Sequence, residues 1–212
     1  MSAFSNLLIL YDKYYVLNNK ENTNEFKNDL ECEGRKRIEQ LDYLLNKIQV
    51  KQTRAIEIPQ RSQNEFQKLI DNAKQNNLDV TIASSSSIIN MTKEEGEEYN
   101  HLNFEIELLT ENFYRIAFRL SKIIEKLPGL GKLKSNGVRD VRNNLIEHPE
   151  AKDIQVILQS FSLGNKESGP IIKAIRYSDQ TEIFPDKGLY FNAEEIKTNL
   201  EKVLIKFIGS NS

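Results

Sequence analysis

The most regular pattern of hydrophobic positions in the chain lies between residues 92 and 127. Apolar side chains recur there at alternating steps of three and four residues: Tyr99, Leu102, Ile106, Leu109, Phe113, Ile116, Leu120, Ile123 and Leu127. Such steps keep side chains on one face of an α-helix. Thr92 and Glu95 have the spacing of a capping box at its start, and Pro128 followed by Gly129 stops it. The pattern predicts one unbroken helix that packs nearly parallel to its neighbours in a bundle.

Shorter apolar stripes predict further helices before this one. Residues 4–18 carry a first stripe, and a second helix is expected to end near Val50. Residues 51–60 predict a connector that ends at Pro59, and a shorter amphipathic helix follows it. The serine-rich residues 78–91 predict a surface loop. The apolar positions of the second and third helices are Ile38, Leu41, Leu45 and Ile48, and Phe66, Leu69, Ile70 and Ala73.

Beyond residue 150 the apolar period changes from that of a helix to that of a strand. Alternating side chains on both sides of a Gly/Pro-rich turn predict an antiparallel hairpin over residues 152–191, with room for a third strand near 189–191. Asn192 and Glu195 then cap a last helix with Ile196, Leu200, Val203, Leu204 and Phe207 on its apolar face. The fold class predicted is mainly α: a helical bundle in residues 1–150 and a βα elaboration in 151–212, packed together as one compact domain.

Composition limits the classes of function. The chain has 212 residues, of which 39% are hydrophobic and 28% charged, as in an ordinary globular protein. Its formal net charge is −2, so bulk charge does not predict nucleic-acid binding, and any such contact requires a local basic patch. Cys32 is the only cysteine, which excludes an internal disulfide and fits a reducing cytoplasm. We expect no metal site, no cofactor, no signal peptide and no membrane span.

The polar side of the long helix has acidic residues in its first half and basic residues in its second. The acidic residues are Glu94, Glu95, Glu97, Glu98, Glu105 and Glu107, and the basic ones are Arg115, Arg119, Lys122 and Lys126. The interpretation we favour is a solvated face whose charges suit the helix dipole. The alternative is a row that follows the phosphates of a nucleic acid and leads toward Lys132, Lys134, Arg139 and Arg142.

The segment 137–149 contains the residues that are the strongest candidates for a catalytic site. Val138, Val141 and Leu145 have the spacing of one helical face. Because Pro149 disfavours a helical backbone at the residue before it, the helix should end at His148. At about 100° per residue, Arg142 and His148 fall on opposite flanks of the apolar stripe. Each can therefore present its polar end at the edge of a packed seam.

This segment resembles the HEPN family of small all-α proteins, many of which are RNA-cleaving toxins or defence nucleases. The resemblance lies in Arg142-Asn143, the apolar Leu145-Ile146 and the helix-ending His148-Pro149. It implies an HEPN-like bundle and a metal-independent endoribonuclease of toxin–antitoxin or phage-defence type, whose site is completed in a homodimer. It also implies RNA as substrate and an antitoxin or other protein partner. One subgroup has Tyr two residues after the His, where this chain has Glu150, so we do not transfer that subgroup's regulation.

The chemistry expected of the motif is RNA cleavage without a metal. His148 would move protons at the 2′-hydroxyl and the leaving oxygen, since its ordinary pKa lies near neutral pH. Arg142 would stabilise the phosphorane with its planar fork. The expected binding residues are Asn143, Glu147, Arg139, Lys134 and Lys132. Three alternatives stay open: an Arg142 ion pair beside a helix-capping His148, a non-catalytic HEPN-like RNA-binding or dimerisation module, and an adaptor whose hairpin extends a partner's sheet.

Overall fold

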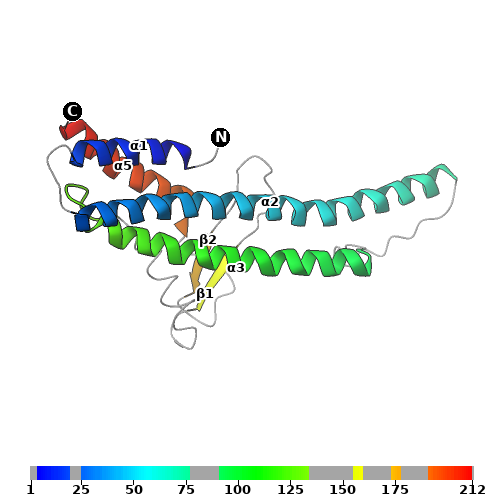
Figure 1. Cartoon of the computed structure of the whole chain (residues 1–212). Coiled ribbons are helices and arrows are strands. Elements are labelled where there is room, and N and C mark those ends of the chain that lie inside the picture. Colours follow the sequence, from blue (N-terminus) through cyan, green and yellow to red (C-terminus); the bar gives the residue numbers. More distant parts are fainter. Residues whose placement is uncertain are drawn as a thin grey trace. The chain divides into compact units, whose positions relative to one another are not determined.

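The computed structural model describes residues 4–19, 25–76, 91–133, 155–159, 173–177 and 191–211. The fold of these residues is mainly helical (Figure 1). In chain order the elements are α1 (Ser5–Asn18), α2 (Glu25–Gln75), α3 (Lys93–Ile124), β1 (Gln155–Gln159), β2 (Lys173–Tyr177), β3 (Phe191–Asn192) and α5 (Ala193–Asn211). None of these helices is both long enough and apolar enough to cross a membrane.

The chain divides into two compact units. The first comprises Met1–Gln49 with Glu107–Ser212, and the second comprises Val50–Ile106. The first unit therefore holds α1, the sheet and α5 together with one part each of α2 and α3. The second holds the other parts of α2 and α3. The domain boundary predicted at residue 150 lies outside the described residues, so it stays a prediction.

The core of the first unit is built on the predicted seam of α3. Phe113 and Leu120 are fully buried, and α3 runs without a break to Ile124, so the prediction of one long helix is confirmed. The other helices bury stripes of their own: Leu7, Tyr11 and Tyr14 of α1, Ile38, Leu41 and Ile48 of α2, and Ile196, Leu200 and Leu204 of α5. Burial of each large apolar side chain stabilises the fold by about 1.5–3 kcal/mol.

A close approach between α1 and α2 positions the first helix. A Cβ atom at Gly34 would collide with the hydroxyl of Tyr11 and would lie 3.3 Å from Cγ2 of Ile123. The Tyr11 hydroxyl instead donates a hydrogen bond to the backbone oxygen of Glu31 at 2.9 Å. The ring of Tyr11 can reach this place only because residue 34 has no side chain.

The turn that ends α3 is covered by α1 and α5, which lie side by side in Figure 1. Gly129 and Gly131 have φ values of 73° and 74°, which favour glycine. A Cβ atom at Gly129 would also collide with the ring of Phe207. Tyr14 contacts the edge of the Phe207 ring at 4.9 Å between centroids and donates to the backbone oxygen of Pro128 at 3.3 Å. The predicted stop of the long helix is therefore confirmed.

The strands form one sheet in the order β1-β2-β3, and both pairs are antiparallel. Ile157 faces Ile175 in the first pair, and Ala174 faces Phe191 in the second. Residues 160–172 and 178–190 lie outside the described part, so the hairpin as a whole stays a prediction. The sheet leads directly into α5, which begins at Ala193 and buries the predicted apolar positions Ile196, Leu200 and Leu204.

The second helix differs from its prediction. The expected end near Val50 and the connector 51–60 are wrong, because α2 continues to Gln75 with Pro59 inside it. The buried seam passes through Ile48, Gln52, Ala55 and Pro59, at steps of four, three and four. A buried glutamine and a proline occupy two seam positions there, which hid the helical pattern. The short helix predicted around Phe66 is the last part of α2, and the predicted loop 78–91 lies almost wholly outside the described residues.

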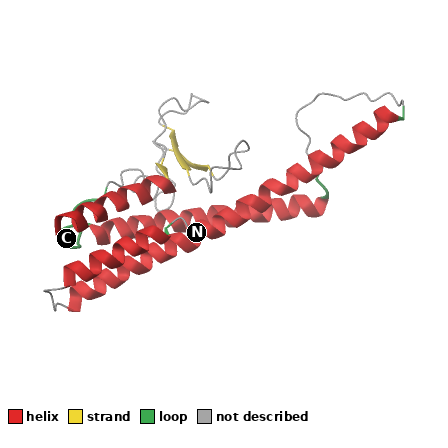
Figure 2. Ribbon diagram, turned by 90° about the horizontal axis from the view of Figure 1, so that it is seen from above, coloured by secondary structure: helices red, strands yellow, loops and turns green. Residues whose placement is uncertain are grey.

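In the second unit the two helical stretches run side by side in opposite directions (Figures 1 and 2). The capping box predicted at the start of α3 is confirmed. The backbone N–H of Glu95 donates to Oγ1 of Thr92 at 3.2 Å, and the backbone N–H of Thr92 donates to Oε2 of Glu95 at 2.9 Å. These two bonds satisfy N–H groups that a helix start otherwise leaves unpaired.

Candidate functional site

Most of the predicted site falls on residues that the structure does not describe. Arg142, His148, Asn143, Glu147 and Arg139 all lie within 134–154, as does Lys134. Their placement and their roles therefore stay predictions. Lys132 is the single predicted site residue in the described part, and its side chain is exposed just after the turn that ends α3.

The segment that follows α3 is packed into the first unit up to Leu133. Leu127, Leu130 and Leu133 are buried, with 3%, 6% and 5% of their surface exposed, whereas Lys132 between them is exposed. Three buried leucines at steps of three anchor this segment while its polar residues face solvent. The predicted motif therefore begins a few residues from an ordered anchor at the end of α3.

An exposed row of bases lies on the same helix, upstream of this anchor. Arg115, Arg119, Lys122 and Lys126 are all exposed. At about 100° per residue, their steps of four, three and four place them within an arc of roughly 60° on α3 and the turn after it. We call these four residues the basic face. The exposure expected of them from the sequence is confirmed.

The basic face has few partners. Nζ of Lys122 lies 2.9 Å from Oε2 of Glu125 and 5.7 Å from the centre of the Phe118 ring. Arg115, Arg119 and Lys126 form no ion pair with any carboxylate in the described ranges. A helix dipole favours cations only within the last turn, and α3 ends at Ile124. The dipole therefore accounts for Lys122 and not for Arg115, which lies nine residues before the end of the helix.

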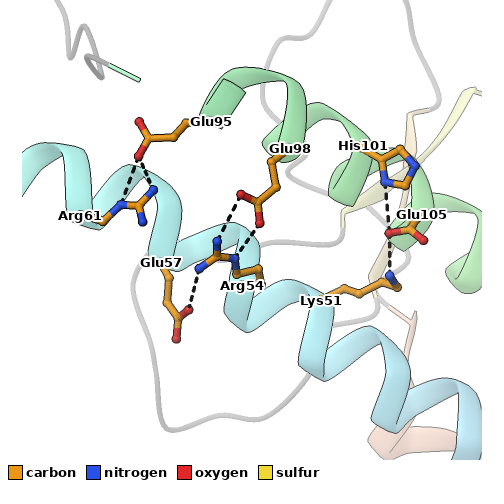
Figure 3. A network of polar contacts seen from close by, with 8 residues as sticks. All are labelled: Lys51, Arg54, Glu57, Arg61, Glu95, Glu98, His101 and Glu105. Atoms are coloured by element: carbon orange, nitrogen blue, oxygen red, sulfur yellow. Dashed lines mark hydrogen bonds and ion pairs between the residues drawn. The ribbon is translucent and has the colours of Figure 1, made fainter. Parts of the chain in front are cut away.

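The second unit has the opposite arrangement, in which bases of α2 pair with acids of α3 (Figure 3). Nε of Arg54 donates to Glu98 at 2.7 Å, and Nζ of Lys51 donates to Glu105 at 2.6 Å. Arg61 donates to Glu95 from Nε at 3.1 Å and also from its NH2 group. We call these three cross-helix pairs the ladder. Its acids are members of the acidic half that the sequence indicated. Of its bases, Lys51 and Arg54 lie in the part of α2 that was predicted as a connector, and Arg61 directly follows that part.

The ladder also shifts the titration of its carboxylates. The hydrogen bond from Arg54 lowers the pKa of Glu98, and the hydrogen bond from Lys51 lowers the pKa of Glu105. His101 is on the surface, with 72% of its side chain exposed, and its Nδ1 lies 3.4 Å from Oε2 of Glu105. Because its charges are matched, the ladder leaves no free cation for a ligand.

No protein-family model, curated protein or solved structure matches this chain. Within the described ranges no three His, Cys, Asp or Glu side chains gather in a way that could hold a metal ion. Cys32 is exposed and free. The function is therefore inferred from the chain's own residues.

Proposed function

We propose that this protein is a metal-independent endoribonuclease of the toxin–antitoxin or phage-defence type. The observation that carries the proposal is the Arg142-Asn143 pair followed by His148-Pro149 at a helix end that the sequence predicts. This pattern resembles the HEPN motif. We also infer that the fold is an HEPN-like helical bundle with a C-terminal hairpin and helix as its elaboration.

The described residues support this proposal in two ways. The long helix that precedes the motif packs as the core of the first unit, with Phe113 and Leu120 fully buried. The segment after it is anchored by buried leucines up to Leu133, four residues before the motif begins at Gly137 in the sequence. The basic face and Lys132 are exposed and precede the motif in the sequence, and they supply the local positive charge that a net charge of −2 does not.

The proposed reaction is transesterification within RNA. The 2′-oxygen attacks the adjacent phosphorus, the bond from phosphorus to the 5′-oxygen breaks, and a 2′,3′-cyclic phosphate and a 5′-hydroxyl result. One histidine removes the proton of the 2′-hydroxyl and another protonates the leaving oxygen. Because a single chain offers one such histidine in its motif, the proposed site takes His148 and Arg142 from each of two copies. Arg142 stabilises the charge on the phosphorane.

The test is cleavage of a mixed RNA pool by purified protein in excess chelator, followed by analysis of the product ends. We expect 5′-hydroxyl ends from the native protein. His148→Ala should reduce the rate by about 10²–10⁴-fold, as for loss of a general acid–base group. The matched control is His101→Ala, which removes the exposed histidine of the second unit and should leave cleavage unchanged. Arg142→Lys should recover little of the activity lost in Arg142→Ala, because a point charge does not replace the fork.

Products with 5′-phosphates, or equal cleavage by the native protein and His148→Ala, would contradict this mechanism. A second candidate is then a non-catalytic RNA-binding or dimerisation module of the same fold. The observation that favours it is the basic face, whose exposed bases need no catalytic partner to bind an anionic strand. RNA binding without cleavage would select this candidate.

A further inference from the structure

We infer that the basic face of α3 binds the phosphate backbone of single-stranded RNA. The inference names the surface that holds the substrate strand, and for the choice of RNA it rests on the proposed function. The binding site consists of Arg115, Arg119, Lys122 and Lys126, with the ring of Phe118 at its edge.

The geometry of the row suits a strand of phosphates. At a rise of about 1.5 Å per residue, the row from Arg115 to Lys126 extends roughly 17 Å along α3 and the turn after it. Its bases follow one another every three or four residues, which is about 4.5–6 Å. Each arginine offers a planar fork that matches two phosphate oxygens, and each lysine offers a point charge. One RNA strand that follows the axis of α3 can therefore contact successive bases of the row.

The arrangement lacks a structural reason within the described residues. Arg115 and Arg119 lie four residues apart, as do Lys122 and Lys126, and like charges at this spacing destabilise a helix. Glu125 offsets one of the four charges, through its ion pair with Lys122. In the second unit Lys51, Arg54 and Arg61 of α2 are each matched by a glutamate of α3. A bound polyanion would neutralise the positive charges of the basic face, as the glutamates neutralise those of the ladder.

A single strand fits the basic face better than a duplex. The bases lie on the convex surface of one helix, and the deep, narrow major groove of duplex RNA does not admit such an element. Phe118 is half-buried, and Lys122 lies over its ring at 5.7 Å. An aromatic ring beside a row of cations is a platform on which an unpaired base can stack. Paired bases in a duplex are not available for such stacking.

The experiment uses 2′-O-methyl oligouridine, which has no 2′-hydroxyl to attack the phosphate and so stays intact under the proposed cleavage mechanism. Binding to the full chain is measured by fluorescence anisotropy over a series of salt concentrations. The variant Arg115→Gln/Arg119→Gln should weaken binding about tenfold or more at low salt and make the salt slope shallower by about 1.4. The control Lys13→Gln/Lys36→Gln removes the same charge from exposed lysines of α1 and α2 in the same unit and should change little.

A third variant separates stacking from charge. Phe118→Leu keeps an apolar side chain at this half-buried position but removes the ring. It should weaken binding of the single strand about fivefold or more, with the salt slope unchanged. Equal losses in the two double variants, an unchanged salt slope, or tighter binding of a 2′-O-methyl duplex would overturn the inference. Binding by the basic face without RNA cleavage would refute the nuclease alone, and cleavage with unaltered binding in Arg115→Gln/Arg119→Gln would refute the binding site alone.

Discussion

The charged side chains in the two halves of α3 differ in whether they form ion pairs. In the second unit, Glu95, Glu98 and Glu105 each accept a hydrogen bond from a base of α2. In the first unit, Arg115 and Arg119 face solvent and pair with no carboxylate that the structure describes. In the sequence, the acidic and the basic half of α3 both look like a charged, solvent-exposed face. The structure distinguishes them, because bases of α2 pair with the acidic half and no described carboxylate pairs with Arg115 or Arg119. Charges that are matched within the chain specify packing, whereas unmatched charges are free to specify a ligand.

The ladder is best understood as a device for register. Along the antiparallel helices, Lys51, Arg54 and Arg61 meet Glu105, Glu98 and Glu95 in reverse order. A shift of one helix by a turn would break all three pairs at once. Exposed ion pairs add little to stability, so their main effect is to favour this alignment over others.

The largest effect should come from the apolar seam that underlies both regions. Phe113→Ala removes a fully buried ring from the first unit and should lower the free energy of unfolding by about 3–5 kcal/mol. The control is Phe104→Ala, because that side chain is 59% exposed and its loss should change stability by less than about 0.5 kcal/mol. Urea denaturation of both variants measures the difference. Equal effects would mean that the seam is not what holds α3 in place.

Reversing one pair of the ladder should have a smaller effect. Arg54→Glu places a carboxylate against Glu98 and near Glu57, so repulsion replaces attraction and the melting temperature should fall. Adding Glu98→Arg to the same chain restores the pair with its polarity exchanged and should recover most of the loss. Both changes should shrink in about 1 M salt, where exposed charges are screened. A double variant no more stable than the single one would argue against direct pairing.

Protonation of Glu98 and Glu105 at acidic pH should remove the stabilising contribution of the ladder. The pKa values of Glu98 and Glu105 are lower in the folded protein than in the unfolded chain. Their stabilising contribution is therefore present above the unfolded pKa of about 4.3 and is lost as the pH falls through the folded pKa. Glu98→Gln should accordingly destabilise the protein at pH 7, and the difference from the native protein should shrink as the pH falls below the unfolded pKa. Urea midpoints measured across this range, with the exposed Glu107→Gln as control, test this; a difference that persists in acid would contradict it.

The smallest effect on stability should come from the basic face. Arg115→Gln/Arg119→Gln removes two exposed charges that repel each other and should change the free energy of unfolding by less than about 0.5 kcal/mol. The contrast with Arg54→Glu sharpens the difference between matched and unmatched charge. A loss above about 1 kcal/mol in urea denaturation would show that these arginines have structural partners.

The sequence was sufficient wherever one helix buries a continuous apolar stripe. For α3 both the capping box at Thr92 and the buried Phe113 and Leu120 are as predicted. It was insufficient for α2, where Gln52 and Pro59 occupy buried seam positions. A proline inside a helix costs several kcal/mol in isolation, and burial of Ala55 and Ile58 near it offsets that cost.

The candidate site could be predicted only in part for a related reason. The exposure of Arg115 and Arg119 follows from their place opposite the seam, so periodicity alone predicts it. The ladder depends on two helices meeting in one register, and the periodicity of a single helix contains no such information. Because Arg142 and His148 lie outside the described residues, their role rests on the motif.

The buried tyrosines of the first unit provide an absorbance signal by which its unfolding can be followed. The chain has eight tyrosines and no tryptophan, so the absorbance of ionised tyrosine has no competing signal. Burial raises the pKa of Tyr11, Tyr14 and Tyr114 well above the ordinary value. Their neutral form therefore stabilises the fold fully below about pH 10, and that contribution is lost as the pH rises toward the folded pKa. After a jump to alkaline pH, the absorbance of tyrosinate should rise in a fast and a slow phase. The rate of the slow phase should report how fast α1 detaches from Gly34 and from the turn at Pro128.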